Sequence, residues 1–215
     1  MIISFEGIDG CGKSTQEKLL ATWLTDAGHA VHRVREPGGT LLSEKIRDIL
    51  LDPAGEIDPF AEMLLFSAAR AQLCRTKIKS WHHNGDIVLC DRFFDSTVAY
   101  QGGGRGVADP SWIESFQHEI TGGLIPDRTY YFRIDLETAR GRMGNRTDSV
   151  DDRMEASGRT FFKRVIASYE NLAAEHPERI LVLDATLRVN DLAELIKTDI
   201  NRVLSRGRNT ESVRL

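Results

Sequence analysis

Short apolar runs and longer amphipathic stretches alternate along the chain, and this alternation predicts the order of its elements. Five runs rich in β-branched and aromatic residues have the length of buried strands, near 1–6, 30–35, 86–90, 128–134 and 179–183. Apolar residues recur at helical spacing near 13–27, 40–51, 60–83, 93–101, 110–120, 136–142, 157–175 and 190–204. With right-handed crossovers, this order predicts an α/β fold: a doubly wound, parallel five-stranded sheet flanked by helices.

Three polar segments interrupt the regular pattern. In "QGGGRG", 101–106, three successive glycines predict a break in helical structure, because glycine strongly disfavours a helix. The segment 142–154, "RMGNRTDSVDDRM", is polar and charged between two helical stretches, so we expect a loose connection. We expect a single domain over 1–205 and a polar C-terminal tail over 206–215.

Charge and composition narrow the class of protein. The chain has 28 lysine and arginine residues against 32 acidic ones, a net charge of −4, so its bulk charge does not favour nucleic acid. The apolar runs are too short to cross a membrane, and no targeting signal is recognisable. Three cysteines without a CxxC pair disfavour a disulfide framework or a zinc site. We therefore expect a cytoplasmic protein with reduced thiols.

The first candidate for chemistry is a glycine-rich loop after the first predicted strand. Gly7, Gly12, Lys13 and Ser14 match the pattern G-x-x-x-x-G-K-[ST], with a strand before it and a helix after it. Glycines let backbone N–H groups turn inward around an anion, and the helix adds its positive N-terminal end. Lys13 can reach the β- and γ-phosphates, and the Ser14 hydroxyl can ligate Mg²⁺. The loop predicts a nucleoside triphosphate site but does not name the reaction.

A second candidate follows the third predicted strand, in "VLCDRFFDSTVAYQGGGRG". Asp91 and Arg92 stand where that strand ends, and doubly wound sheets bind ligands at the carboxyl ends of their strands. Asp91 can hold Mg²⁺ as a Walker B acid does, and Arg92 can bind a second phosphate in a bidentate fork. The pair predicts two phosphate-bearing substrates that meet at one metal ion. The alternative is a surface ion pair at the start of a helix.

Several stretches together resemble the bacterial thymidylate kinase family. They are "FEGIDGCGKST", "REPGGT", "FSAARAQ", "DRFFDSTVAYQGGGRG", "PD" at 126–127 and "DDRMEASGRTFFKRVIASYENLA", in the family's order and at similar spacing. The resemblance covers about Ile3 to Asp184. It implies a fold like that of the P-loop nucleoside monophosphate kinases, with a small lid over about 142–154. It also implies ATP as phosphoryl donor, dTMP as acceptor, dTDP as product, Mg²⁺ as metal ion and a homodimer.

The resemblance assigns residues to the acceptor dTMP. Phe66 would stack on the thymine ring, and Arg70, four residues later on the same helix face, would bind a base carbonyl. Thr97 would read the polar edge of the base, and Tyr100 would leave no room for a 2′-hydroxyl. An acid at the position of Asp9 would face the 3′-hydroxyl. The other residues expected to contact dTMP are Arg35, Pro37, Gly38, Arg92, Ser96 and Gln101.

The resemblance also assigns the donor side and the catalytic charges. Some thymidylate kinases carry an arginine just after the loop acid, where this chain has Gly10, so the positive charge should come from the lid. There, Arg153 is the first candidate and Arg146 the second for stabilising the transferred phosphoryl group, together with Lys13, Asp91 and Arg92. The metal ligands would be Ser14 and Asp91. The residues expected to contact ATP are Gly7, Ile8, Asp9, Gly10, Cys11, Gly12, Lys13, Ser14, Thr15 and Arg142.

Other interpretations stay open from the sequence. Phe66 could be a core aromatic, and Asp9 could bond the loop backbone. Arg133 stands where the family pattern often has an acid, and Asp135, two residues on, could take over its role. The chain could phosphorylate another nucleotide or deoxynucleoside. It could also be a regulatory P-loop ATPase, although the NKxD motif of a GTPase is absent from the sequence.

Overall fold

One parallel sheet forms the centre of the computed structural model, which describes residues 1–144 and 157–211, with side chains up to Ser205. Its strand order is β2-β3-β1-β4-β5, and every neighbouring pair is parallel. The predicted fold class and each predicted strand are confirmed. The strands are β1 (Ile2–Glu6), β2 (Val31–Arg35), β3 (Ile87–Asp91), β4 (Arg128–Arg133) and β5 (Ile180–Asp184).

Helices connect successive strands, and α3, η1 and α4 follow one another without a break, as the stretch 60–83 predicts. The final helix continues to Glu211, so residues 206–211 of the expected tail are helical. The connecting elements are α1 (Lys13–Asp26), α2 (Leu41–Leu51), α3 (Pro59–Leu73), the π-helical η1 (Cys74–Ile78), α4 (Lys79–His83), α5 (Phe94–Thr97), the π-helical η2 (Val98–Gly104), α6 (Pro110–Thr121), α7 (Leu136–Gly144), α8 (Arg159–Glu175) and α9 (Val189–Glu211).

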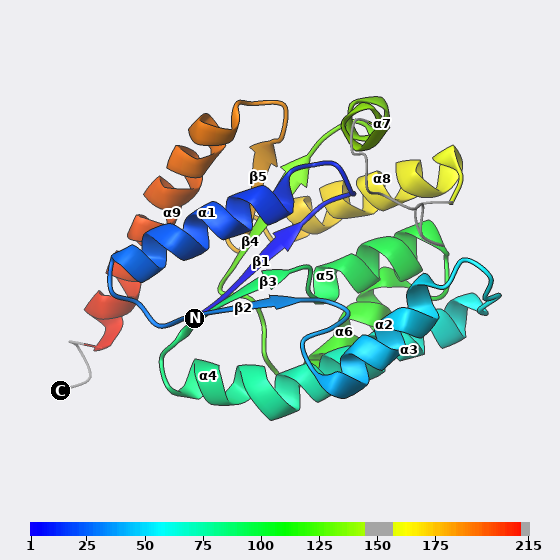
Figure 1. Cartoon of the computed structure of the whole chain (residues 1–215), viewed down its shortest axis with the longest axis horizontal. Coiled ribbons are helices and arrows are strands. Elements are labelled where there is room, and N and C mark those ends of the chain that lie inside the picture. The colour runs from blue at the N-terminus through cyan, green and yellow to red at the C-terminus, as the bar shows by residue number, and fades with distance from the viewer. Residues whose placement is uncertain (145–156, 212–215) are drawn as a thin grey trace.

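Successive strand residues point to opposite sides of the sheet, and most residues of the central strands β1, β3 and β4 are buried, so both faces are covered there. On one face, α1 and α9 lie side by side (Figure 1). Tyr130 of β4 reaches Asp199 of α9 on that face, at 3.0 Å. On the other face, Tyr131 stacks on Tyr169 of α8. Helices therefore pack on both faces of the sheet.

The helical break predicted at the three glycines is wrong. The π-helix η2 runs through Gly102, Gly103 and Gly104 and packs along α8. A Cβ atom on Gly103 would lie 2.5 Å from the Cβ of Ser168, and one on Gly104 would lie 2.5 Å from the ring of Phe161. Glycine is therefore needed here for close packing of two helices, and this packing outweighs its low helix propensity.

The strand order reverses direction around β1, which is the first strand but lies at the centre of the sheet. From β1 the chain runs first to β2 and β3 on one side, then to β4 and β5 on the other. Sheets of this type bind ligands at the carboxyl ends of the strands beside such a switch point. The segments after β1 and β3 both begin there. No described helix has the length and apolar character needed to cross a bilayer.

Candidate functional site

The loop after β1 has the backbone of an anion-binding nest. Gly7, Gly10 and Gly12 have positive φ angles of 139°, 82° and 94°, which residues with side chains rarely adopt, and α1 begins directly after them. A Cβ atom on Gly10 would lie 2.4 Å from the carbonyl oxygen of Ala139 in α7. Glycine at this position therefore has a packing cause: α7 rests on the loop.

Asp9 is the meeting point of two cations. Its Oδ1 accepts a hydrogen bond from Lys13 Nζ at 2.8 Å and another from Arg92 Nη2 at 2.7 Å. Burial opposes ionisation of Asp9, but the charges of Arg92 and Lys13 outweigh it and hold the pKa of the carboxyl well below its usual range. Burial also works against the charge of Lys13, yet its pKa is raised because Asp9 lies beside it. The three side chains form a stable, charged cluster.

Ser14 and Asp91 join the loop to the end of β3. The Ser14 hydroxyl donates to Asp91 Oδ2 at 2.5 Å. The contact follows from the sheet, because Phe5 near the end of β1 is paired in register with Asp91. A hydroxyl and a carboxylate oxygen are ligands that suit Mg²⁺. Their position at the opening of α1 fits a metal ion bound to a triphosphate in the loop.

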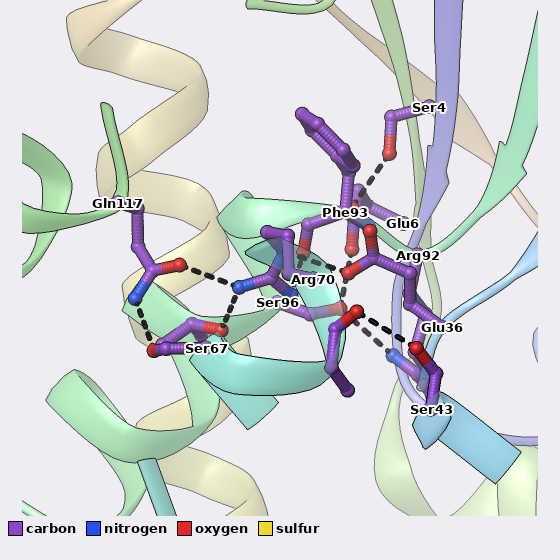
Figure 2. A network of polar contacts seen from close by, with 12 residues as sticks. Ser4, Glu6, Glu36, Ser43, Ser67, Arg70, Arg92, Phe93, Ser96 and Gln117 are labelled. Atoms are coloured by element: carbon purple, nitrogen blue, oxygen red, sulfur yellow. Dashed lines mark hydrogen bonds and ion pairs between the residues drawn. The ribbon is translucent and has the colours of Figure 1, made fainter. Parts of the chain in front are cut away.

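A buried carboxylate, Glu6, holds the turn that carries Arg92 (Figure 2). Glu6 Oε1 accepts from the Phe93 backbone N–H at 2.6 Å, and Oε2 accepts from Ser96 Oγ at 2.6 Å. Burial raises the pKa of Glu6. Arg92 itself has a φ of 72°, uncommon for a residue with a side chain, and donates to the carbonyl of Gly7 at 2.8 Å. The backbone turn and the guanidinium group of Arg92 are therefore both held in place.

A cavity of about 200 Å³ opens beside this cluster. It is bounded by residues from the loop, from the segment after β2, from α2 and α3, and from the segment after β3. Nine predicted acceptor residues line it together: Asp9, Pro37, Phe66, Arg70, Arg92, Ser96, Thr97, Tyr100 and Gln101. Phe66 also packs against the small core of Ile46, Leu50 and Ala69, so the two interpretations of Phe66 are compatible.

Arg70 is fully buried in the wall of the cavity, and its position is fixed by side chains from separate elements (Figure 2). Its Nε donates to Glu36 Oε2 at 2.6 Å. Its Nη1 donates to Thr97 Oγ1 at 2.7 Å and to Gln117 Oε1 at 2.6 Å, and its Nη2 donates to the carbonyl of Phe93 at 3.1 Å. A guanidinium has five N–H groups, so these four bonds leave one on Nη2 for a ligand.

Two fully buried polar atoms of cavity-lining residues have no hydrogen-bond partner in the part of the chain that the structure describes. The hydroxyl of Tyr100 and Oε1 of Glu36 are buried and make no hydrogen bond among the residues that the structure describes. Buried polar atoms are ordinarily satisfied, so such atoms in a cavity indicate a polar ligand. Burial raises the pKa of Glu36 to about 7, although Arg70 opposes the rise.

Some residues that the sequence assigns to the site do not line the cavity. Arg35 is exposed, pairs with Glu44 and does not line the cavity. Arg142 is exposed on α7, and Arg146 and Arg153 lie outside the described residues. Thr15 is exposed at the start of α1, Ile8 is buried in the core, and burial raises the pKa of the Cys11 thiol, as suits an unreactive cysteine.

Arg133 is the exposed last residue of β4 and does not line the cavity. It forms an ion pair with Glu170 of α8. Asp135 does not line the cavity either; its carboxylate accepts from the backbone N–H and the hydroxyl of Thr138 and so caps the start of α7.

Three cavity-lining residues were missed from the sequence: Glu36, Arg47 and Leu51. Glu36 belongs to the "REPGGT" motif, so the motif was a sequence signal that could have identified it. Arg47 and Leu51 lie four residues apart on α2, and this spacing places them on one helix face. The sequence contains no signal that this face borders the cavity.

The fold and this edge of the sheet define a protein of the P-loop nucleoside monophosphate kinase type, with a phosphate loop and a separate cavity joined by Asp9 and Arg92. Comparison with known proteins gives the family. The family model for thymidylate kinase matches residues 5–196. The chain belongs to the thymidylate kinase family, as the sequence resemblance predicts.

Individual relatives agree with this assignment along most of the chain. A thymidylate kinase of Gloeobacter violaceus is 42% identical over 209 residues, which cover 97% of this chain and 98% of that protein. A thymidylate kinase of Deinococcus radiodurans is 44% identical over 192 residues, 89% of this chain and 92% of that protein. The crystal structure of thymidylate kinase from Ehrlichia chaffeensis superposes with a TM-score of 0.75 at 34% identity, covering 94% of this chain and 98% of that one.

Proposed function

We propose that this protein transfers the γ-phosphoryl group of ATP to dTMP and forms dTDP. The observation that carries the proposal is the position of Asp9. Its carboxylate binds Lys13 of the phosphate loop on one side, and on the other it lines the cavity together with Arg92. Phosphoryl transfer depends on holding two substrates in line and on positive charge at the transferred group. One loop that borders both sites meets the first requirement.

On the donor side, backbone N–H groups of the glycine loop would hold the ATP phosphates, and Lys13 would neutralise charge on the β- and γ-phosphates. Lys13 must then leave Asp9 or share its ammonium between the acid and the phosphate. Ser14 and Asp91 would hold Mg²⁺, which supplies further positive charge to the phosphates when bound. The contact between these two side chains supports that assignment.

On the acceptor side, Arg92 would bind the phosphate of dTMP, with Arg47 as a second cation at the cavity wall. Phe66 would lie against the base and Tyr100 against the sugar. Asp9 would accept a hydrogen bond from a sugar hydroxyl. Arg70 has one N–H left for a base carbonyl, so it would make a single hydrogen bond rather than a bidentate pair.

Further positive charge at the transferred phosphoryl group would come from Arg153 or Arg146, and Arg142 would contact ATP. The family resemblance supports this, together with the absence of any side chain at Gly10. A regulatory ATPase would need no acceptor cavity, and the nine predicted residues that line one here favour the kinase. We also place the protein in the cytoplasm.

We also propose a homodimer. Exposed apolar side chains at helical spacing support a second copy as the partner: Leu42 and Ile49 on α2, and Phe60 and Leu64 on α3. α2 and α3 pack against each other, so these residues belong to adjoining helices. Light scattering should give the mass of two chains, and Leu64→Glu should shift it to one. A single-chain mass for the unaltered protein would contradict the dimer.

A panel of acceptors tests the activity. With ATP and Mg²⁺, dTMP should be the preferred acceptor over dUMP, dCMP, thymidine and purine deoxynucleoside monophosphates, with dTDP identified by mass spectrometry. A clear preference for another nucleotide would replace the proposed acceptor.

A further inference from the structure

Gln101 lines the same cavity as Arg70, and a buried carboxylate behind the wall determines which of its amide atoms faces the ligand. Gln101 is buried, and its Nε2 donates to Glu62 Oε1 at 2.9 Å. Glu62 lies on α3, is fully buried and does not line the cavity. It also pairs with Arg105 through contacts of 3.2 and 3.3 Å.

The chemistry of Glu62 allows one orientation of the Gln101 amide. An ionised carboxylate only accepts hydrogen bonds, so the amide must present its NH₂ group to Glu62. Turning the amide over would bring two oxygens together inside a buried wall, where an unsatisfied acceptor is costly. The amide oxygen of Gln101 is therefore the atom left for the cavity, and it has no hydrogen-bond partner among the described side chains and backbone groups.

Arg70, which lines the same cavity, has the opposite hydrogen-bonding character. Arg70 offers only N–H donors, and four of its five bonds go to Glu36, Thr97, Gln117 and the backbone of Phe93. The wall thus presents a donor from Arg70 and an acceptor from Gln101. The imide edge of thymine has the matching groups, the O4 acceptor next to the N3–H donor. Cytosine has the reverse order at these two positions, an amino donor next to an unprotonated nitrogen.

We infer that Glu62 is a specificity-determining positioning residue, which selects thymine and uracil over cytosine by holding the oxygen of Gln101 toward the base. This inference rests on the proposed function, because it names how the acceptor cavity distinguishes pyrimidines. Glu62 touches no substrate and acts through Gln101. Its effect lies in the ratio of activities with different bases, whereas a residue needed only for stability would change all activities together.

The test compares kcat/KM for dTMP, dUMP and dCMP in the full chain. Glu62→Gln keeps the shape of the side chain but lets the partner donate, so the Gln101 amide can turn over. We expect the dTMP-to-dCMP ratio to fall by about tenfold or more, the value of roughly one hydrogen bond. The dTMP-to-dUMP ratio should not change, because both bases share the imide edge.

Glu17→Gln is the matched control. Glu17 is also buried, pairs with Arg33 through two bonds of 2.6 Å, and lies outside the cavity wall. Its loss should leave both ratios at the wild-type values. A Glu62→Gln variant whose dTMP-to-dCMP ratio equals that of wild type overturns the inference.

Gln101→Met provides a second test of base selection by the Gln101 oxygen, and it can be used even if the Glu62→Gln variant does not fold. Methionine removes the acceptor, so activity with dTMP and dUMP should fall more than activity with dCMP. An equal fall with all three acceptors overturns the inference while the proposed function stands. A wild-type protein that makes no dTDP from dTMP contradicts the proposed function itself.

Discussion

Asp9 and Arg92 form an ion pair of 2.7 Å that links the phosphate loop to the end of β3. The link joins residues that are 83 positions apart in the chain. Lys13 binds the same oxygen of Asp9 at 2.8 Å. An acid inside an anion-binding loop is unexpected on electrostatic grounds alone. Here the acid binds two cations, Lys13 from the phosphate loop and Arg92 from the turn after β3, so its charge holds both beside the cavity.

Replacing Asp9 by asparagine should therefore reduce turnover strongly while the protein stays folded. Asparagine keeps the shape but loses the charge that orients Lys13 and Arg92. We expect kcat with dTMP to fall about 100-fold or more, the scale typical of a lost electrostatic group in an active site. Steady-state kinetics measure the effect, with Asp26→Asn at the exposed end of α1 as control. Turnover close to that of wild type would refute the role given to Asp9.

Gly10 should tolerate no side chain, because α7 rests on it. Gly10→Ala combines an unfavourable φ of 82° with a contact of 2.4 Å to the Ala139 carbonyl. Gly28→Ala is the matched control, since its φ is 87° but its Cβ would meet no atom within 4 Å. Thermal and urea unfolding should show that Gly10→Ala loses about 1–3 kcal/mol more than Gly28→Ala, the usual cost of overpacking. Equal losses would mean that α7 does not constrain the loop.

Gln117 should affect binding of dTMP without touching it. Its oxygen accepts from Arg70 at 2.6 Å, and its nitrogen donates to Ser67 at 2.8 Å. Gln117→Leu leaves an N–H of Arg70 unsatisfied and lets the guanidinium move. We expect KM for dTMP to rise about tenfold with a smaller change in kcat, the pattern of weakened ground-state binding. Glu119→Gln, exposed on the same helix, is the control. An unchanged KM would show that Arg70 needs no support from Gln117.

Glu36 should make stability depend on pH. Burial raises its pKa from 4.5 to about 7, against the charge of Arg70. Between those values the folded protein holds a proton that the unfolded chain releases, so the contribution of Glu36 to the free energy of unfolding decreases as pH rises. Glu36→Gln should make the total decrease smaller by up to about 1.4 kcal/mol per pH unit. Urea unfolding at about pH 5, 6 and 7 measures both slopes, and identical slopes would exclude Glu36 as the source.

The features that the sequence predicted correctly are those that depend on residues close together in the chain. Strand and helix periods, and the spacing of Gly7, Gly12 and Lys13, depend on neighbouring residues, so the sheet and the phosphate loop followed from them. The continuation of η2 through Gly102–Gly104 did not, because its cause is packing against Phe161 and Ser168, more than fifty residues further along the chain.

The candidate site likewise contains residues that the sequence could predict and contacts that it could not. Arg70 stood out because an arginine in an apolar helix needs acceptors. Its partners Glu36, Thr97 and Gln117 come from three different parts of the chain, and no local pattern connects them. Arg133 differs from the acid that is common at its position in the family, and the sequence therefore raised a question about the acceptor site. In the structure Arg133 pairs with Glu170, so it belongs to the contact between β4 and α8.

The fate of the γ-phosphoryl group itself distinguishes a kinase from an ATPase. ATP labelled at the γ-phosphate is incubated with the protein and Mg²⁺, with and without dTMP, and the labelled products are separated. Transfer between two sites joined by Asp9 predicts label in dTDP when dTMP is present and very little inorganic phosphate without it. Label that appears mainly as inorganic phosphate, whether or not dTMP is added, would contradict phosphoryl transfer to dTMP and indicate an ATPase.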